Sequence, residues 1–183
     1  MSAKSIVVLG DSISAGYGIE VQSGWVALLQ KKLADRHPGY TLFNESISGD
    51  TTAGGLARLE QILARHKPDL LLVELGANDG LRGLMPAEMK NNLTAIVQRA
   101  RRAGVKVLLL GMKIPPNYGK RYVEMFYQVY PELAAELKIP FVPFILEEVA
   151  LKPGMLQADG LHPTTQAQPA IAEKIWTYLQ PML

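Results

Sequence analysis

The stretch Ser5-Ile6-Val7-Val8-Leu9-Gly10-Asp11-Ser12 leads an apolar run straight into a short polar turn, and it decides how the rest of the chain is interpreted. A continuous run of branched apolar residues is typical of a strand that is buried on both faces of a sheet. Asp11 and Ser12 both suit the start of a helix, because their side chains accept hydrogen bonds from exposed backbone N–H groups. The stretch therefore predicts a buried strand that ends at a helical turn, with Ser12 at the junction. On local pattern alone, an ordinary capping serine is the simpler interpretation.

Composition limits the possible functions. A chain of 183 residues fits one domain, residues 1–183. The 19 basic and 17 acidic residues nearly balance, which gives no indication of a nucleic-acid partner. The absence of cysteine excludes disulfides, thiolate metal sites and a cysteine nucleophile. No apolar run approaches the roughly 18 residues of a membrane helix, so we expect no stable membrane insertion. The oligomeric state is not indicated.

The N-terminal residues lack the charged and apolar regions of a secretory signal. Two expectations follow. Either the protein is cytoplasmic, or it is periplasmic or secreted and Met1 is a new start after removal of a leader.

Strand-like apolar runs alternate with helix-like amphipathic segments. The expected strands are residues 5–9, 40–44, 70–75, 105–110 and 141–143. The expected helices are residues 25–36, 56–66, 86–103, 122–137 and 163–179. Pro131 predicts a kink or a break in the fourth helix. Alternation of this kind predicts right-handed βαβ units, and hence an α/β fold: a three-layer α/β/α sandwich around a five-stranded parallel sheet.

Polar residues follow four of the expected strands. They are Asp11 and Ser12 after the first strand, Ser48, Gly49 and Asp50 after the second, Asn78 and Asp79 after the third, and Asp159 and His162 after the fifth. The carboxyl ends of parallel strands meet at one edge of a sheet, where ligands bind. A serine, a histidine, a carboxylate, a backbone N–H and an amide are the parts of a serine hydrolase with an oxyanion hole.

The histidine of such a site can be chosen from three. His37 and His66 each end an expected helix, where a cationic side chain is favourable, so we expect both to be structural. His162 follows Asp159 by three residues, a spacing at which the carboxylate can take the Nδ1 proton and leave Nε2 free to accept from a serine. An aspartate cap and a surface histidine before a helix would give the same local pattern.

Four motifs together favour the catalytic interpretation. They are Gly10-Asp11-Ser12, Ser48-Gly49-Asp50, Gly76-Ala77-Asn78-Asp79 and Asp159-Gly160-Leu161-His162-Pro163. In this order and spacing they resemble the four blocks of the SGNH (GDSL-type) hydrolase superfamily along nearly the whole chain. The longer segments 46–51, 74–83 and 115–119 resemble the bacterial thioesterase I, lysophospholipase and arylesterase branch.

The resemblance implies a flavodoxin-like SGNH hydrolase fold and assigns roles to five residues. Ser12 would be the nucleophile, His162 the general base and then the general acid, and Asp159 the residue that orients His162. The N–H groups of Ser12 and Gly49 and the amide of Asn78 would form the oxyanion hole. We expect glycine at position 49 because it lets the backbone approach closely without a Cβ.

The activity that the resemblance implies needs no metal and no cofactor. The expected partners are small-molecule esters and thioesters: aryl esters, short-to-medium acyl esters, acyl-CoA and lysophospholipids. The branch is mostly periplasmic or secreted. Apolar residues near the site are candidates for contact with the acyl group, although each also fits simple loop packing. They are Leu81, Leu84, Ile114, Pro115 and Tyr118.

Asp11 and Asp79 have no role in proton transfer in this scheme, and we expect them to brace loops through backbone hydrogen bonds. A Gly-x-Ser-x-Gly elbow and a phosphate-binding loop are both absent.

Two other functions remain open from the residues. A metal-dependent phosphoesterase would use the donors Asp11, Asp50, Asp79, Asp159 and His162. No second histidine or Asp-x-Asp pair follows the first strand, which counts against it. A flavodoxin-like or receiver-like binding domain would need a cofactor-phosphate loop or an acidic pair after that strand, where only one acid stands.

Overall fold

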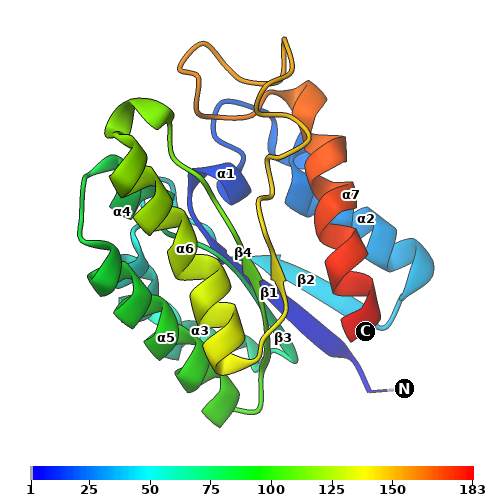
Figure 1. Cartoon of the computed structure of the whole chain (residues 1–183). Coiled ribbons are helices and arrows are strands. Elements are labelled where there is room, and N and C mark those ends of the chain that lie inside the picture. The colour runs from blue at the N-terminus through cyan, green and yellow to red at the C-terminus, as the bar shows by residue number, and fades with distance from the viewer. Residues whose placement is uncertain (1) are drawn as a thin grey trace.

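Five parallel strands form the central sheet of the computed structural model, which describes residues 2–183 (Figure 1). The strands are β1 (Lys4–Gly10), β2 (Tyr40–Asn44), β3 (Leu70–Glu74), β4 (Lys106–Leu110) and β5 (Phe141–Val142). Their order across the sheet is β2-β1-β3-β4-β5, and every neighbouring pair is parallel. The chain reverses its direction across the sheet between β1 and β3, which is where open α/β sheets bind ligands.

Helices cover both faces of this sheet. One layer consists of α2 (Trp25–Arg36) and α7 (Gln168–Leu179), which contact each other. The other consists of α3 (Thr52–His66), α5 (Pro86–Arg102) and α6 (Lys120–Leu137), packed in that order. Figure 1 shows the two layers on opposite sides of the strands. The arrangement confirms the predicted three-layer sandwich.

The apolar runs occupy the middle of the molecule. All five residues of β3 are buried, and residues 6–9 of β1 have no exposed surface. The edge strand β2 differs, because Leu42 is its one buried residue while Thr41 and Phe43 are exposed. Helices therefore bury both faces of the inner strands and cover the edge strand β2 only in part.

The helices differ from the prediction at four boundaries and at Pro131. Helix α5 ends one residue early, at Arg102, and α6 begins two residues early, at Lys120. Helix α3 begins at Thr52, four residues early, because Gly54 and Gly55 lie inside its first turns instead of in a loop. A Cβ at Gly55 would lie 2.3 Å from Leu75 Cδ1, so the glycine lets this helix approach the sheet. Helix α6 continues through Pro131, so the predicted break is absent. Residues 165–167 form a 3-10 turn, and α7 begins only at Gln168.

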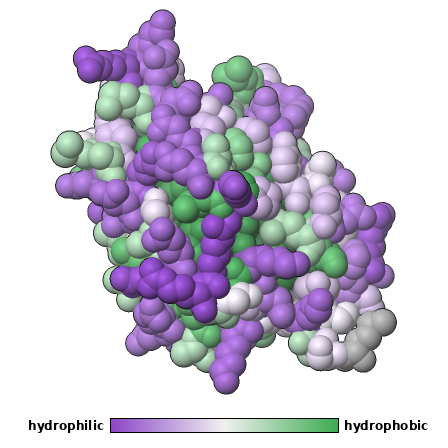
Figure 2. Space-filling view, turned by 60° about the horizontal axis from the view of Figure 1, so that its bottom comes forward, coloured by the Kyte–Doolittle hydropathy of each residue, from purple (hydrophilic) through white to green (hydrophobic). Residues whose placement is uncertain are grey.

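Four short elements lie at the carboxyl end of the sheet. They are α1 (Ser12–Ala15), α4 (Ala77–Leu81) and the 3-10 turns Val21–Ser23 and Pro116–Tyr118. Figure 2 views the opposite end, where the strands begin, and shows a largely hydrophilic surface with hydrophobic side chains in a central band. Within residues 2–183, no helix combines the length and the apolar character that crossing a membrane requires.

Candidate active site

Ser12 is the first residue of α1, directly beyond the end of β1. The Asp11 side chain caps this helix by accepting from the N–H of Ile13 at 3.0 Å. A Cβ at Gly10 would lie 2.8 Å from the hydroxyl oxygens of Ser14 and Ser46, so glycine allows both to pack against the end of the strand. The nucleophile candidate is thus attached to one of the best buried strands of the molecule.

His162 connects Ser12 to Asp159, although 150 residues separate the serine from the histidine. His162 Nε2 lies 2.8 Å from Ser12 Oγ, and His162 Nδ1 lies 2.5 Å from Asp159 Oδ2. The other carboxylate oxygen of Asp159 accepts from the N–H groups of Leu161 at 2.9 Å and His162 at 3.0 Å. The structure therefore brings together the three residues that the sequence analysis combined.

The carboxyl group of Asp159 is held in its charged form. Burial raises its pKa, but hydrogen bonds from the N–H and the ring of His162 and from the N–H of Leu161 together outweigh burial and lower it to about 2. A charged Asp159 keeps the Nδ1 proton of His162 in place, which leaves Nε2 to accept from Ser12.

The predicted oxyanion donors lie on three neighbouring segments. Asn78, in α4, donates its amide to the carbonyl oxygen of Asp50 at 2.9 Å and to Asp11 Oδ2 at 3.4 Å. Gly49 has φ +82°, and nothing lies within 4 Å of a Cβ built there. The expected close approach concerns a substrate oxyanion and stays a prediction. The left-handed backbone conformation of Gly49 also favours glycine.

A buried acid pair behind the serine was missed by the sequence analysis. Glu74, the last residue of β3, has no exposed surface and accepts from Ser14 Oγ at 2.7 Å. Burial, then the neighbouring charge of Asp11, raises the pKa of Glu74 well above its ordinary value. The raised pKa favours the protonated form of Glu74 beside Asp11, and Glu74 Oε2 has no hydrogen-bond partner among the described residues. A lone glutamate that ends an apolar strand is the only sequence signal for this pair.

The two aspartates without catalytic roles brace the site as expected. Asp79, which is buried, accepts from both the N–H and the hydroxyl of Thr52, at 2.9 and 2.7 Å. This contact ties α4 to the start of α3. Asp11 makes the cap of α1 described above.

The carboxylates of the alternative metal site are each engaged elsewhere. Asp50 pairs with Arg58 at 2.7 Å, and Asp79 and Asp159 make the contacts given above. Among residues 2–183, no group of three or more histidines, cysteines or acids is placed to hold a metal ion.

His37 and His66 lie outside the site, as expected. His66 Nε2 lies 2.6 Å from Glu45 Oε1, and its ring stacks on Phe43. The ring of His37 lies 5.8 Å from that of Trp176 on α7.

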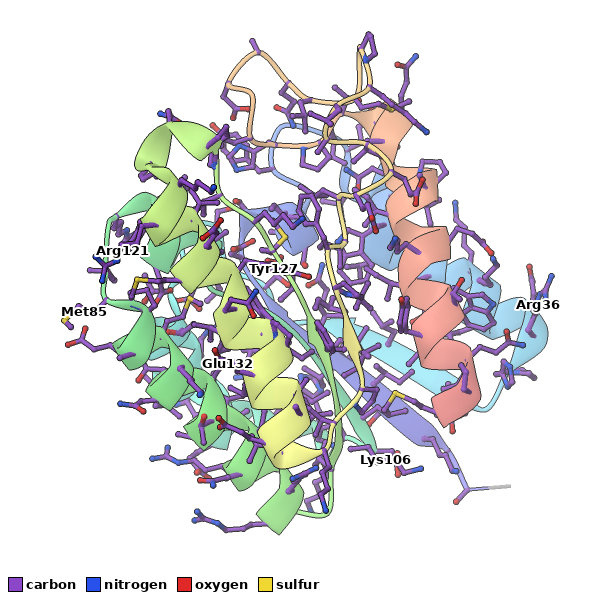
Figure 3. The ribbon with its side chains drawn as sticks, in the orientation of Figure 1. Arg36, Met85, Lys106, Arg121, Tyr127 and Glu132 are labelled. Atoms are coloured by element: carbon purple, nitrogen blue, oxygen red, sulfur yellow. The ribbon has the colours of Figure 1, made fainter. Side chains whose placement is uncertain are left out.

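A pocket of about 430 Å³ opens beside Ser12 and His162. Of the five predicted acyl contacts, Leu81, Ile114 and Pro115 line it, whereas Leu84 and Tyr118 do not. Leu84 and Tyr118 instead brace the segment of residues 81–85. The Tyr118 hydroxyl donates to the carbonyl oxygen of Leu81 at 3.1 Å, and the Tyr122 hydroxyl donates to that of Leu84 at 2.6 Å. Met85, at the end of that segment, points away from the molecule (Figure 3).

The pocket wall is largely apolar, and its largest contribution comes from a segment in which the sequence analysis expected no acyl contacts. The connection from β5 to α7 contributes Phe144, Leu146, Ala150, Leu151, Leu156 and Leu161, and Met112 follows β4. These residues show no regular spacing, so their shared apolar character is the only signal in the sequence.

Comparison with known proteins gives one family and several close relatives. The model of the GDSL-like Lipase/Acylhydrolase family matches residues 8–169. The chain is 54% identical over 182 residues to "Esterase TesA" of Pseudomonas aeruginosa, covering all of this chain and 90% of that protein. It is 48% identical over 172 residues to an "Arylesterase" of Vibrio mimicus, covering 94% of this chain and 86% of that one.

A third relative carries a broader name. The "Thioesterase 1/protease 1/lysophospholipase L1" of Escherichia coli K12 is 45% identical over 182 residues, which cover all of this chain and 86% of that protein. Among solved structures, the "Crystal Structure of TesA" matches with a TM-score of 0.96 and 54% identity, covering 98% of this chain and 100% of that one.

Proposed function

The chain belongs to the GDSL-like lipase/acylhydrolase family and is a carboxylic ester hydrolase, and from this premise we propose that it cleaves esters and thioesters through an acyl-enzyme on Ser12. The observation that carries the proposal is the 2.8 Å contact between Ser12 Oγ and His162 Nε2, continued at 2.5 Å to Asp159. A serine hydroxyl is a weak nucleophile until a neutral imidazole takes its proton. The contact provides that base at hydrogen-bond distance.

The reaction follows from these positions in two stages. Ser12 Oγ attacks the carbonyl carbon of the substrate while its proton passes to His162 Nε2. The tetrahedral intermediate collapses, the bond to the alcohol or thiol breaks, and His162 returns the proton to that leaving group. Water then attacks the acyl-enzyme, again giving its proton to His162, and the acid is released as Ser12 regains its hydrogen. The charged Asp159 stabilises the imidazolium in both stages.

The negative charge of each tetrahedral intermediate needs fixed donors. We assign this role to the N–H groups of Ser12 and Gly49 and to the Asn78 amide. The N–H of Ser12 is at the start of a helical turn. The Asn78 amide lies near it, because it contacts the side chain of Asp11, the residue before Ser12. The Asn78 amide donates one N–H to the Asp50 carbonyl. Its other N–H makes only the 3.4 Å contact with Asp11, so it would turn to a substrate oxyanion, a charged acceptor that forms a strong hydrogen bond.

The substrate class is proposed from the pocket. Its wall is mainly leucine, isoleucine, proline and phenylalanine, which suits an acyl chain or an aromatic group. We propose aryl esters, short-to-medium acyl esters, acyl-CoA thioesters and lysophospholipids as substrates, in keeping with the names of the relatives. We further propose one domain over residues 1–183 and a periplasmic or secreted location, the latter by the sequence resemblance alone.

A pair of substitutions tests the catalytic assignment. Ser12→Ala and His162→Ala should each remove most turnover of p-nitrophenyl butyrate, while circular dichroism remains that of the unchanged protein. A p-nitrophenyl alkylphosphonate should label the unchanged protein once per chain and leave the Ser12→Ala variant unlabelled. Full activity in either variant, or loss of activity of the unchanged protein in EDTA, would contradict the assignment.

A further inference from the structure

Arg58 reaches from α3 to the edge of the sheet that carries the site. Its side chain, 17% exposed, donates through Nε to Asp50 Oδ2 at 2.7 Å. Nη1 donates to the carbonyl oxygen of Glu45, and Nη2 donates to that of Gly10 at 3.3 Å. One guanidinium therefore joins the end of β1, the end of β2 and the loop that follows β2.

Each of the three proposed oxyanion donors is adjacent to an acceptor of Arg58. Ser12 follows Gly10 by two residues, and Gly49 directly precedes Asp50. Asn78 donates its amide to the carbonyl oxygen of Asp50 at 2.9 Å. The three donors come from three separate connections of the fold, and Arg58 contacts two of these connections and reaches the third through Asp50.

The loop is built to receive this contact. A Cβ at Gly54 would lie 1.8 Å from Asp50 Oδ1, so only glycine there lets the carboxylate rest against α3. The Asp50 side chain is 12% exposed, which weakens the screening of the ion pair by salt. A guanidinium spreads five donors over three nitrogens of a planar fork, whereas the three donors of lysine all lie on one nitrogen and suit acceptors on separate segments less well.

We propose that Arg58 is a positioning residue for the oxyanion hole, which sets the relative placement of the Ser12, Gly49 and Asn78 donors through its contacts with Gly10, Glu45 and Asp50. The inference rests on the proposed function. Arg58 need not contact the substrate, because it acts through the segments that it holds in place. Its loss therefore affects the transition state and leaves ground-state binding of the substrate unchanged.

The test uses Arg58→Met, which keeps the length of the stem and removes the guanidinium, and Arg58→Lys. A displacement of about 1 Å in a catalytic group costs on the order of 10²-fold in rate. We therefore expect kcat for p-nitrophenyl butyrate to fall about 10- to 100-fold in Arg58→Met, with KM within about two-fold of the unchanged protein. Arg58→Lys should recover only part of the loss.

Inhibitors separate positioning from general loosening of the fold. A trifluoromethyl ketone forms a tetrahedral adduct with an oxyanion, whereas the corresponding secondary alcohol forms none. Arg58→Met should weaken the ketone about as much as it lowers kcat and leave the alcohol unchanged. Arg99, an exposed arginine whose contact with Glu60 spans 3.9 Å, provides the control, and Arg99→Met should change none of these values.

Asp50→Asn gives a second route to the same inference, because it keeps the side-chain volume and removes the ion pair. It should lower kcat in the same way, and Arg58→Met should add little in the Asp50→Asn background, since both act on one network. If Arg58→Met fails to fold, Arg58→Lys and Asp50→Asn carry the expectation. Unchanged kcat in these variants, or equal losses for the ketone and the alcohol, would overturn the inference. Loss of activity in Ser12→Ala would still support the proposed function in that case.

Discussion

The ring of Tyr17 lies 4.4 Å from the ring of His162, centroid to centroid, with 40° between their planes. Ser12 and Asp159 contact the two ring nitrogens, so the imidazole is held at both ends and covered on one face. Gln157 strengthens this arrangement by donating its amide to the carbonyl oxygen of Tyr17 at 2.8 Å. The segment after α1 and the segment that carries His162 are thus joined beside the contact between Ser12 and His162.

Replacing Tyr17 should affect catalysis through the position of His162. We expect Tyr17→Ala to lower kcat for p-nitrophenyl butyrate about ten-fold, because the imidazole loses the ring that restrains it. Tyr17→Phe should remain close to the unchanged protein, since the ring makes the contact. Steady-state kinetics of both variants test this. Equal losses in the two would show that the hydroxyl carries the effect.

Asn78→Ala removes one proposed oxyanion donor. Loss of such a donor costs roughly 10²- to 10³-fold in kcat, and we expect that range here with little change in KM. Measurement of both constants on the same ester distinguishes the roles. An increase confined to KM would mean that Asn78 binds the substrate without stabilising the oxyanion.

Gly49→Ala should lower both stability and activity, and Gly104 offers a matched control. Gly49 and Gly104 have φ values of +82° and +79°, and neither has an atom within 4 Å of a built Cβ. An alanine in this left-handed region costs about 1–2 kcal/mol, so urea unfolding should report similar losses for both variants. Only Gly49→Ala should reduce kcat, because only its backbone N–H faces the proposed oxyanion. Equal kcat values in both variants would contradict that role.

Phe144→Ala should change the preference for acyl length. Phe144 lines the pocket, and burying a phenylalanine side chain is worth about 1.5–3 kcal/mol. We expect kcat/KM for p-nitrophenyl octanoate to fall about ten-fold while that for the acetate hardly changes. Phe43→Ala, on the edge strand, makes the same substitution outside the pocket. An equal fall in kcat/KM for both esters would mean that the octanoate chain does not contact Phe144.

Glu74→Gln should alter how stability depends on pH. The folded state raises the pKa of Glu74 well above its ordinary value of 4.5, whereas the unfolded chain releases this proton near pH 4.5. As pH rises above 4.5, the unfolded state is therefore increasingly favoured, by at most about 1.4 kcal/mol per pH unit. Glutamine never ionises, so the variant escapes this loss and gains stability relative to the unchanged protein.

Urea unfolding at pH 5 and pH 8 measures the effect. At pH 8 the free energy of unfolding of the Glu74→Gln variant, relative to that of the unchanged protein, should be higher than at pH 5. The same substitution at the exposed Glu60 serves as the control. Parallel pH curves for Glu74→Gln and the unchanged protein would show that Glu74 is already ionised in the folded state.

The regular elements could be predicted where apolar spacing alone defines them. Helix α2 and strand β2 have the predicted boundaries, β3 and β4 differ by one residue at one end, and β1 is one residue longer at each end. The larger errors occur at glycine and proline. Gly54 and Gly55 are read as loop residues, although close packing against Asp50 and Leu75 requires them inside α3.

The contacts among the proposed catalytic residues could be predicted from the sequence, and those of their supports could not. Motif order is enough to combine Ser12 with Asp159 and His162. Glu74 and Arg58 cannot be found in this way, because one ends an ordinary apolar strand and the other lies on an ordinary amphipathic helix. Their roles depend on contacts between segments that are distant in the sequence.

The two halves of the candidate site are attached to parts of the molecule that differ in local stability. Ser12 follows a strand whose central residues are completely buried, so its surroundings open only when the sheet itself unfolds. His162 lies in the connection of residues 143–167, whose structure is a series of turns with one short 3-10 turn and an isolated bridge between Leu156 and Pro163. Mild heat or denaturant should release the histidine first. Loss of turnover would then give the earliest sign of unfolding, before circular dichroism records any change in the sheet.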